Sequence, residues 1–319
     1  MERNAAGALV AVGMLRGANF LFVGLLVQQI AAPELVAGRL GFAALAATAF
    51  LVARGSFSPM SFGSIRAATM LASLDTVVPY TLLAFAQTSI DSGVAAILAT
   101  TAPLFTMLVA ITLGGDERLS PLRLAGLLLA LFGVALLTGF GVLDVTQGDG
   151  PAIGAVILAS VSYGGSIVYA RHLLRSHDAI TLTTLKLSSG AIQALVVVLV
   201  VEGMPSYGAL DVQGWLFLVV LGVGGTGLAY LLHFWSVARV GSVRGSMVTY
   251  ISPVASLLLG CLVLGEALTI EMLAGVVIIA TGVAAVMYAQ TIEWQFRKTW
   301  CATAGQDSTS CRLLFAAAG

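Results

Sequence analysis

Ten apolar stretches, most of them about 20 residues long, follow one another along the chain with short polar breaks between them. Each is about long enough to cross the ~30 Å hydrocarbon layer of a bilayer as a helix. The pattern therefore predicts an all-α polytopic membrane protein with ten transmembrane helices. The expected spans are residues 5–28, 33–53, 66–88, 92–114, 120–140, 151–172, 179–201, 213–237, 242–264 and 269–290.

The second half of the chain repeats the residue order of the first half. Matching residues recur at an offset of 150 around the prolines and of 147 farther upstream. The pairs are Arg16 with Tyr163, Arg39 with Lys186, Asp75 with Gly225, Tyr80 with Tyr230, and Pro103 with Pro253. Such self-similarity predicts two copies of one five-helix unit, residues 1–145 and 146–290. We expect residues 291–319 to form a loosely ordered cytoplasmic tail.

The placement of Lys and Arg predicts how the chain is oriented. Of 15 such residues, three lie well inside spans, and the other 12 (15 − 3) lie in cytoplasmic segments or at the cytoplasmic ends of spans if the N-terminus is cytoplasmic. The opposite loops carry only acids, such as Glu34 and Glu202. Both termini are thus expected in the cytoplasm. Because five spans per copy is an odd number, the second copy enters from the other side, and the repeats are inverted. Inverted repeats suit alternating access, with a substrate site near the midplane.

Composition narrows the classes of function. The chain is 59% hydrophobic and 9% charged, against roughly a quarter charged in a soluble domain. Net charge is zero without a basic arm, so we expect no nucleic-acid partner. The three cysteines lack metal-ligand spacing, and no metal or cofactor is predicted. An intramembrane enzyme is disfavoured, because HExxH, GxSxG and paired aspartates are missing, and no GxxxxGK[ST] loop indicates ATP use.

Several motifs resemble those of the EamA-type transporters of the drug/metabolite transporter superfamily. They are the stretch Gly17-Ala18-Asn19-Phe20, Arg39 after Pro33, and a Pro…Gly-Glu…Gly…Gly-Val pattern in both halves. The resemblance covers about residues 5–290. It implies ten helices, an inner-membrane location and movement of small metabolites, often export of amino acids or related compounds. The family commonly has Trp where this chain has Arg16, so the pocket is expected to differ here. Because residue 17 onward has a repeat partner, we interpret residues 5–28 as a span and not as a signal peptide.

Four charged residues lie well inside the expected spans, and a charged residue at a helix centre costs about 2.5–3.5 kcal/mol. Arg16 is expected to face the central cavity and to hold a substrate carboxylate. The alternative is a structural pair between Arg16 and Asp75. Asp75 is then either a plain counter-ion or, with a raised pKa, a carrier of a coupling proton.

Arg39 and Lys186 place one cation in each half at opposite expected depths, like gates at either mouth of a cavity. Snorkelling to the headgroups is the alternative. Together with Arg16 and Asp75 they give three cations against one anion, which favours substrates bearing a carboxylate or phosphate.

Further residues are candidates for the pocket and for helix breaks. His233 could titrate near neutrality or be a hydrogen-bonded core histidine. Asn19, Tyr80, Tyr163, Tyr230 and Trp235 are polar or aromatic groups at midspan that are suited to line a pocket or to pack in the core. Pro79, Pro103 and Pro253 disturb spans and free backbone carbonyls, as hinges or as static kinks. Gly126 with Ala130, and Gly275 with Ile279 and Gly282, offer small faces for helix packing.

These patterns favour a secondary transporter of a small metabolite, an amino acid or another carboxylate-bearing solute, in the cytoplasmic membrane. The alternatives are a drug or cation efflux transporter and a passive facilitator or channel. The expected partners are a small-molecule substrate and the lipid bilayer, and a homodimer is left open.

Overall fold

The computed structural model describes residues 2–26, 29–55, 61–86, 98–112, 120–138, 150–259 and 270–303. The described residues are helical apart from short turns and loops, which confirms the all-α class. The first half contains α1 (Glu2–Leu26), α2 (Ala32–Ala53), α3 (Phe62–Ala72), η1 (Ser73–Val77), α4 (Val78–Ala86), α6 (Ala102–Thr112) and α7 (Pro121–Thr138). The second half contains α8 (Gly150–Leu173), α9 (Ala179–Val201), η3 (Tyr207–Ala209), α10 (Val212–Gly222), η4 (Val223–Leu228), α11 (Ala229–Val240), α12 (Ser242–Ser246), α13 (Val248–Leu259) and α14 (Ile270–Thr303).

Local sequence explains where several helices begin and end. The Asp178 carboxylate accepts from the backbone N–H of Ile180 at 3.1 Å and caps α9. Asp211 caps α10 in the same way, accepting from Gly214 N at 2.6 Å. Gly241 ends α11 with φ of 92°, a left-handed conformation that glycine adopts without strain, and turns the chain into α12.

Every expected span overlaps a described helix, but the helices differ in length. Within the described residues, four segments are long and apolar enough to cross a membrane: Ala32–Ala53, Gly150–Leu173, Ala179–Val201 and Val212–Val240. Shorter apolar helices lie at Ala102–Thr112, Pro121–Leu136 and Leu273–Ala289. Residues 92–97, where the fourth span was expected to start, lie outside the described residues. The count of ten transmembrane helices stays a prediction.

Two repeat-equivalent helices each contain one wider, π-helical turn. The turn η1 joins α3 to α4, and η4 joins α10 to α11 at the positions that the offset of 150 relates to η1. In η1 the N–H of Val78 reaches back to Ser73 O, five residues earlier. Such turns are often found at functional sites. Here η1 contains Asp75, and η4 contains its repeat equivalent Gly225.

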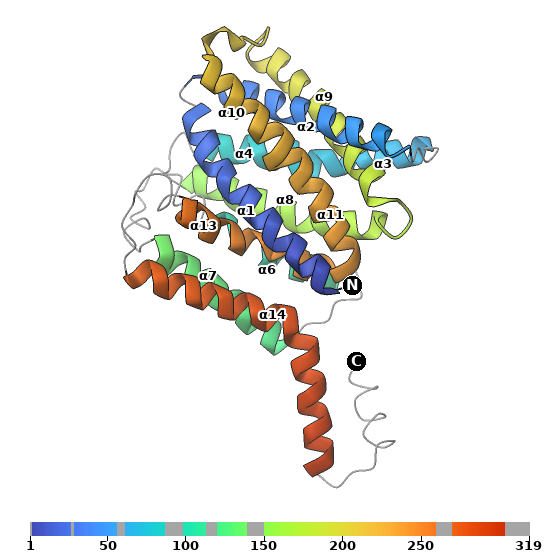
Figure 1. Ribbon diagram of the computed structural model, residues 1–319, viewed down its shortest axis with the longest axis vertical. Coiled ribbons are helices and arrows are strands. Elements are labelled where there is room, and N and C mark those ends of the chain that lie inside the picture. Colours follow the sequence, from blue (N-terminus) through green and yellow to red (C-terminus); the bar gives the residue numbers. More distant parts are fainter. Residues whose placement is uncertain are drawn as a thin grey trace.

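The two halves pack against each other with exchanged partners. Helix α1 contacts α11 and α13, and its equivalent α8 contacts α4 and α6. In the same way α3 packs on α9, and α10 packs on α2. The remaining equivalents pack on each other, α2 on α9 and α7 on α14; the α7–α14 pair lies at one end of the body (Figure 1). Each of these contacts between the halves therefore has a counterpart in which the halves are swapped.

Helices α2 and α9 run antiparallel where they meet. A Cβ on Gly190 would lie 3.7 Å from Leu40 Cδ1, near the start of α2. Farther along α2, the Thr184 hydroxyl donates to the carbonyl of Ala47 at 3.2 Å. As residue numbers rise along α2, the contacting numbers fall along α9, so equivalent helices point in opposite directions.

Helices α7 and α14 also run antiparallel, and glycines bring them into backbone contact. A Cβ on Gly126 would lie 2.8 Å from the carbonyl oxygen of Gly282, and one on Gly133 would lie 2.8 Å from Ile279 N. The small packing faces expected at Gly126 and Gly282 are thus confirmed.

Two apolar cores each join helices of both halves. One joins α2, α3, α8, α9 and α11 and includes Leu40, Leu187 and Phe234. The other joins α6, α7, α12, α13 and α14 and includes Leu127 and Ile279. Most other apolar side chains of the outer helices are exposed, as expected for surfaces that face lipid.

The expectation of a loosely ordered tail directly after residue 290 is wrong for its first part. Helix α14 continues to Thr303 and extends away from the rest of the protein (Figure 1). Residues 291–303 contain Glu, Gln, Arg and Lys, which form helices well, and the first glycine after them is Gly305. Residues 304–319 lie outside the described residues.

Candidate functional site

A buried ion pair links the two halves. The Lys186 ammonium on α9 pairs with the Asp75 carboxylate in η1, and their exposed fractions are 0% and 6%. The second carboxylate oxygen accepts from Ser166 Oγ on α8 at 2.8 Å. The Lys186 ammonium also lies 3.1 Å from the centroid of the Tyr230 ring. Both charges are thus compensated inside the protein, and the pair as a unit is neutral.

Pro79 explains why further hydroxyl groups converge on η1. A proline has no N–H for the carbonyls four and five residues before it, which here belong to Asp75 and Leu74. Both carbonyls find donors on the second half instead. The Tyr230 hydroxyl donates to Asp75 O at 3.2 Å, and Ser162 Oγ donates to Leu74 O at 2.7 Å.

In the repeat-equivalent region of the second half, around η4, the described residues include no carboxylate. Arg39 on α2 donates from Nε to Thr226 Oγ1 at 2.6 Å, and its guanidinium lies 4.7 Å from the centroid of Tyr80. Asn19 on α1 donates from Nδ2 to the carbonyl of Gly225 at 2.9 Å. The Asn19 Oδ1 atom is buried and has no hydrogen-bond partner. A buried acceptor without a donor is costly and marks a place where a ligand donor can bind.

Arg16 lies between these two regions. Its Nη2 donates to His233 Nδ1 at 2.9 Å, and its guanidinium lies 4.8 Å from the centroid of Tyr230. Because a guanidinium can only donate, His233 Nδ1 must accept. The proton is then on Nε2, which donates to the Gly245 carbonyl at 3.2 Å. The arrangement therefore uses neutral His233 as a hydrogen-bonded support for Arg16.

Aromatic rings join the regions into one polar network. Tyr80 and Tyr163 meet edge to face with centroids 6.4 Å apart. Ser166 Oγ lies 2.8 Å from both the Tyr163 carbonyl and Asp75 Oδ1, so its one hydroxyl proton links the two acceptors. Arg39 contacts Tyr80, so the network continues from Arg39 through both rings to the ion pair. We call this set the central cluster: Arg16, Asn19, Arg39, Asp75, Tyr80, Tyr163, Ser166, Lys186, Thr226, Tyr230 and His233.

The central cluster has more positive than negative charge. The cluster contains three cations, Arg16, Arg39 and Lys186, and one carboxylate, that of Asp75. Among the described residues, Asp75 pairs with Lys186, and neither guanidinium pairs with a carboxylate. An uncompensated guanidinium in a membrane-embedded region is costly, so the cluster favours binding of an anionic group.

Two of the alternatives need correction. Arg16 does not pair with Asp75, because Lys186 binds that carboxylate. Lys186 does not snorkel, since its side chain is fully enclosed. Arg39 and Lys186 belong to one continuous network, and their role as gates stays a prediction.

Three candidates lie apart from the central cluster. The Trp235 ring lies under the Arg239 guanidinium, 3.8 Å from its centroid, near the end of α11. Pro103 is the second residue of α6 and does not interrupt it, because the missing N–H of a proline has no partner in a first helical turn. Pro253 lies inside α13, which continues past it.

The sequence analysis missed Ser162, Ser166 and Thr226. The repeat contained the signal for two of them: Ser166 is the equivalent of Asn19 at the offset of 147, and Thr226 of Thr76 at 150. Serine and threonine are small and uncharged, so the sequence alone does not distinguish these three residues from other polar residues in the spans.

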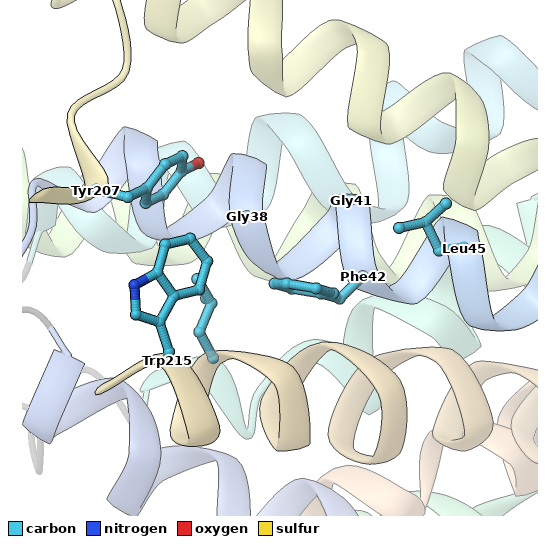
Figure 2. Close-up of a pocket in the computed structure, with 7 residues that line it drawn as sticks. Gly38, Gly41, Phe42, Leu45, Tyr207 and Trp215 are labelled. Atoms are coloured by element: carbon cyan, nitrogen blue, oxygen red, sulfur yellow. The ribbon is translucent and has the colours of Figure 1, made fainter. Parts of the chain in front are cut away.

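A pocket among the described residues lies elsewhere, in an open groove of about 260 Å³ between α2 and α10 (Figure 2). Its lining is apolar, and Leu45 and Trp215 on its rim are 68% and 40% exposed. Figure 2 shows the rings of Tyr207, Trp215 and Phe42 along it. The Tyr207 hydroxyl is already used, donating to Glu34 O at 3.0 Å. A groove without a free polar group on the outer surface does not select a polar solute.

The fold and the central cluster define an α-helical membrane protein with buried charges between two similar halves, which is typical of transporters. The chain belongs to the EamA-like transporter family, whose pattern matches residues 4–139 and again 150–288. It is thus a membrane protein of a transporter family whose pattern occurs twice.

Named relatives agree with this assignment. "Uncharacterized transporter YoaV" of Bacillus subtilis is 26% identical over 202 residues, 63% of this chain and 68% of YoaV. "Uncharacterized inner membrane transporter YedA" of Escherichia coli K12 is 26% identical over 279 residues, 86% of this chain and 88% of YedA. One solved crystal structure has a TM-score of 0.75 at 19% identity, covering 88% of this chain and 97% of its own, which shows likeness of fold alone.

Proposed function

We propose that the protein is a secondary transporter that moves a small carboxylate-bearing metabolite, an amino acid or a related compound, by alternating access. The observation that carries this proposal is the central cluster itself. It holds two guanidinium groups that pair with no described carboxylate, at the junction of two halves with exchanged packing. Export is the direction that the family resemblance favours.

Packing supports the inverted arrangement that alternating access needs. Equivalent helices meet antiparallel in both α2–α9 and α7–α14. A two-fold axis that relates antiparallel neighbours is perpendicular to them, so for membrane-crossing helices it lies in the membrane plane. Two halves related in this way can exchange conformations and thereby exchange the side from which the cluster is reached.

We place the protein in the cytoplasmic membrane with both termini in the cytoplasm. The distribution of Lys and Arg supports this orientation, and the relative YedA is named an inner membrane transporter.

The test combines binding and transport with purified protein. A ligand that binds the folded state raises the melting temperature by mass action, and carboxylate-bearing solutes are expected to do so. In proteoliposomes the same solutes should show saturable uptake against their own gradient. The variant Arg16→Gln should remain folded and lose both effects.

Two rival functions give different results in the same assays. A drug or cation efflux transporter would be stabilised by cationic drugs alone. A passive facilitator would equilibrate the solute without accumulating it. Arg16→Gln could also fail to fold while Arg16→Lys folds and is as active as the parent protein. That result would indicate that Arg16 has a structural role.

A further inference from the structure

The central cluster consists of two half-sites that the repeat makes equivalent. In the first half-site, Asp75 binds the cation Lys186 and accepts a hydrogen bond from Ser166. The equivalents of these three residues are Gly225, Arg39 and Asn19, at offsets of 150, 147 and 147. These also lie together, around η4. The second half-site therefore keeps the cation and the polar neighbour but has no carboxylate.

The contacts around the two half-sites correspond one by one. Lys186 lies over the Tyr230 ring as Arg39 lies over its equivalent Tyr80. Arg16 lies over Tyr230 as its equivalent Tyr163 lies against Tyr80. The surroundings are thus matched, and the missing carboxylate is the main chemical difference between the half-sites.

A neutral group fills the space next to Gly225. A Cβ on residue 225 would overlap Asn19 Oδ1, so the Asn19 amide occupies the place of the missing side chain. That oxygen is buried without a donor. Arg39 meanwhile contacts a hydroxyl and a ring but no described carboxylate. Among the described residues, Arg39 therefore has no carboxylate partner, and Asn19 Oδ1 in the same half-site has no donor.

We propose that the substrate is a net-anionic hydroxy acid whose carboxylate pairs with Arg39 and whose hydroxyl donates to Asn19. The substrate then supplies the carboxylate that is missing at Gly225. This rests on the proposed function, because it names the substrate class of the same transporter. The ligand carboxylate then completes in the second half-site the arrangement that Asp75 makes in the first. A carboxylate forms two hydrogen bonds with a guanidinium, which makes Arg39 well suited to the role.

The same geometry disfavours zwitterionic amino acids. An ammonium group needs a counter-charge in a region of low dielectric, and Asp75 is already bound by Lys186 and Ser166. The rings of Tyr80 and Tyr230, which could attract an ammonium, already contact protein cations. A second positive charge would therefore add to an existing excess, whereas a hydroxyl in its place adds none.

Matched ligand pairs test the substrate class. The purified full-length protein is titrated with lactate and alanine, malate and aspartate, and phenyllactate and phenylalanine, and melting temperatures give the affinities. Each pair differs by a hydroxyl in place of the ammonium. At least one acid should bind at least about tenfold more tightly than its amino acid, since the unmatched ammonium loses solvation without a partner.

The ligand position at Arg39 is tested by variants in which the second half-site is given the side chains of the first. Asn19→Ser with Gly225→Asp recreates the Asp75 and Ser166 pair beside Arg39. The new carboxylate should neutralise Arg39 and weaken acid binding at least about tenfold, because the ligand then meets a like charge. The matched control is Asn19→Ser with Gly225→Asn, which adds the same bulk without charge and should bind more tightly than the Asp variant. If neither folds, Arg39→Gln against Arg39→Lys decides, since only Lys keeps the charge.

The outcomes separate this inference from the proposed function. If amino acids bind and the hydroxy acids do not, the substrate class is wrong while a transporter of carboxylate-bearing solutes stands. If acid binding survives in both Arg39→Gln and the Gly225→Asp variant, the Arg39 position is wrong. If no solute of either class binds and none is accumulated in proteoliposomes, the proposed function itself is wrong.

Discussion

The hydroxyl of Tyr230 donates to the backbone carbonyl of Asp75 at 3.2 Å, joining a residue of the second half to a π-helical turn of the first. The contact exists because Pro79 provides no N–H for this carbonyl. A side chain from one half thus completes the backbone hydrogen bonding of the other, next to the buried ion pair.

This relationship predicts an energetic coupling between Tyr230 and Pro79. Tyr230→Phe should lower the free energy of unfolding by about 1 kcal/mol, because it removes one buried hydrogen bond and keeps the ring. In a Pro79→Ala background the cost should be smaller, since the substituted alanine supplies a backbone N–H. Thermal melts of the two single variants and the double variant give the coupling energy.

Tyr80→Phe is the matched control for this cycle. Tyr80 is the repeat equivalent of Tyr230, and within the described residues its hydroxyl donates to no carbonyl. It should show little coupling to Pro79. Equal coupling of both tyrosines would mean that the ring environment, and not the freed carbonyl, is responsible.

The sequence predicted the all-α class and the places of the described helices, because these depend on patterns along the chain. Apolar stretches of sufficient length and equivalent residues at a constant offset are visible without knowledge of packing. The same reasoning identified the cations Arg16, Arg39 and Lys186 and the lone acid Asp75 as unusual, since charges within apolar stretches are costly wherever the helices lie.

The pairing of these charges could not be predicted, because it depends on the rotation of each helix. A π-helical turn adds about one residue, which turns the following side chains by about 100° relative to a regular helix. Two such turns lie at η1 and η4. They change which face of α4 and α11 carries Tyr80 and Tyr230, and thereby where Lys186 and Arg16 find partners.

The buried ion pair predicts a large and asymmetric cost of mutation. Lys186→Met leaves Asp75 without its counter-charge and should destabilise the protein by about 3–5 kcal/mol. Adding Asp75→Asn removes the stranded charge, so the double variant should recover much of that loss. Melting temperatures and expression in membranes are the measurements. A double variant as unstable as Lys186→Met alone would show that packing of the lysine stem, and not charge, dominates.

Backbone contact between α7 and α14 predicts that glycines there resist substitution. In Gly282→Ala the new Cβ would lie 2.6 Å from Ala130 N and from Gly126 O, so the helices must separate. We expect a loss of about 1–3 kcal/mol in the free energy of unfolding. Gly154→Ala on α8, where a Cβ meets no atom within 4 Å, is the control and should be neutral or slightly stabilising.

The orientation in the membrane predicts opposite labelling of two loops. In a protein whose native cysteines are replaced by serine, Met204→Cys lies in the loop before α10 and Ser176→Cys in the turn between α8 and α9. A membrane-impermeant maleimide should label residue 204 in intact cells and residue 176 only after permeabilisation. The reverse pattern would place both termini outside, and labelling of both in intact cells would contradict the span count between them.

The hydrogen bond between Arg16 and His233 predicts that their effects on ligand affinity depend on each other. His233→Phe removes the Nδ1 acceptor, so the Arg16 guanidinium should sample more positions. Because Arg16 adds positive charge to the same cluster as Arg39, the affinity for an anionic substrate should fall several-fold, by about 1 kcal/mol for one lost hydrogen bond. His233→Asn keeps an acceptor near the position of Nδ1 and should lose less. The deciding measurement repeats His233→Phe in an Arg16→Lys background. Because a lysine ammonium lacks the guanidinium geometry, His233→Phe should then cost less than in the parent protein. An unchanged cost would mean that His233 acts on the ligand directly or on the fold through Gly245, and not by positioning Arg16.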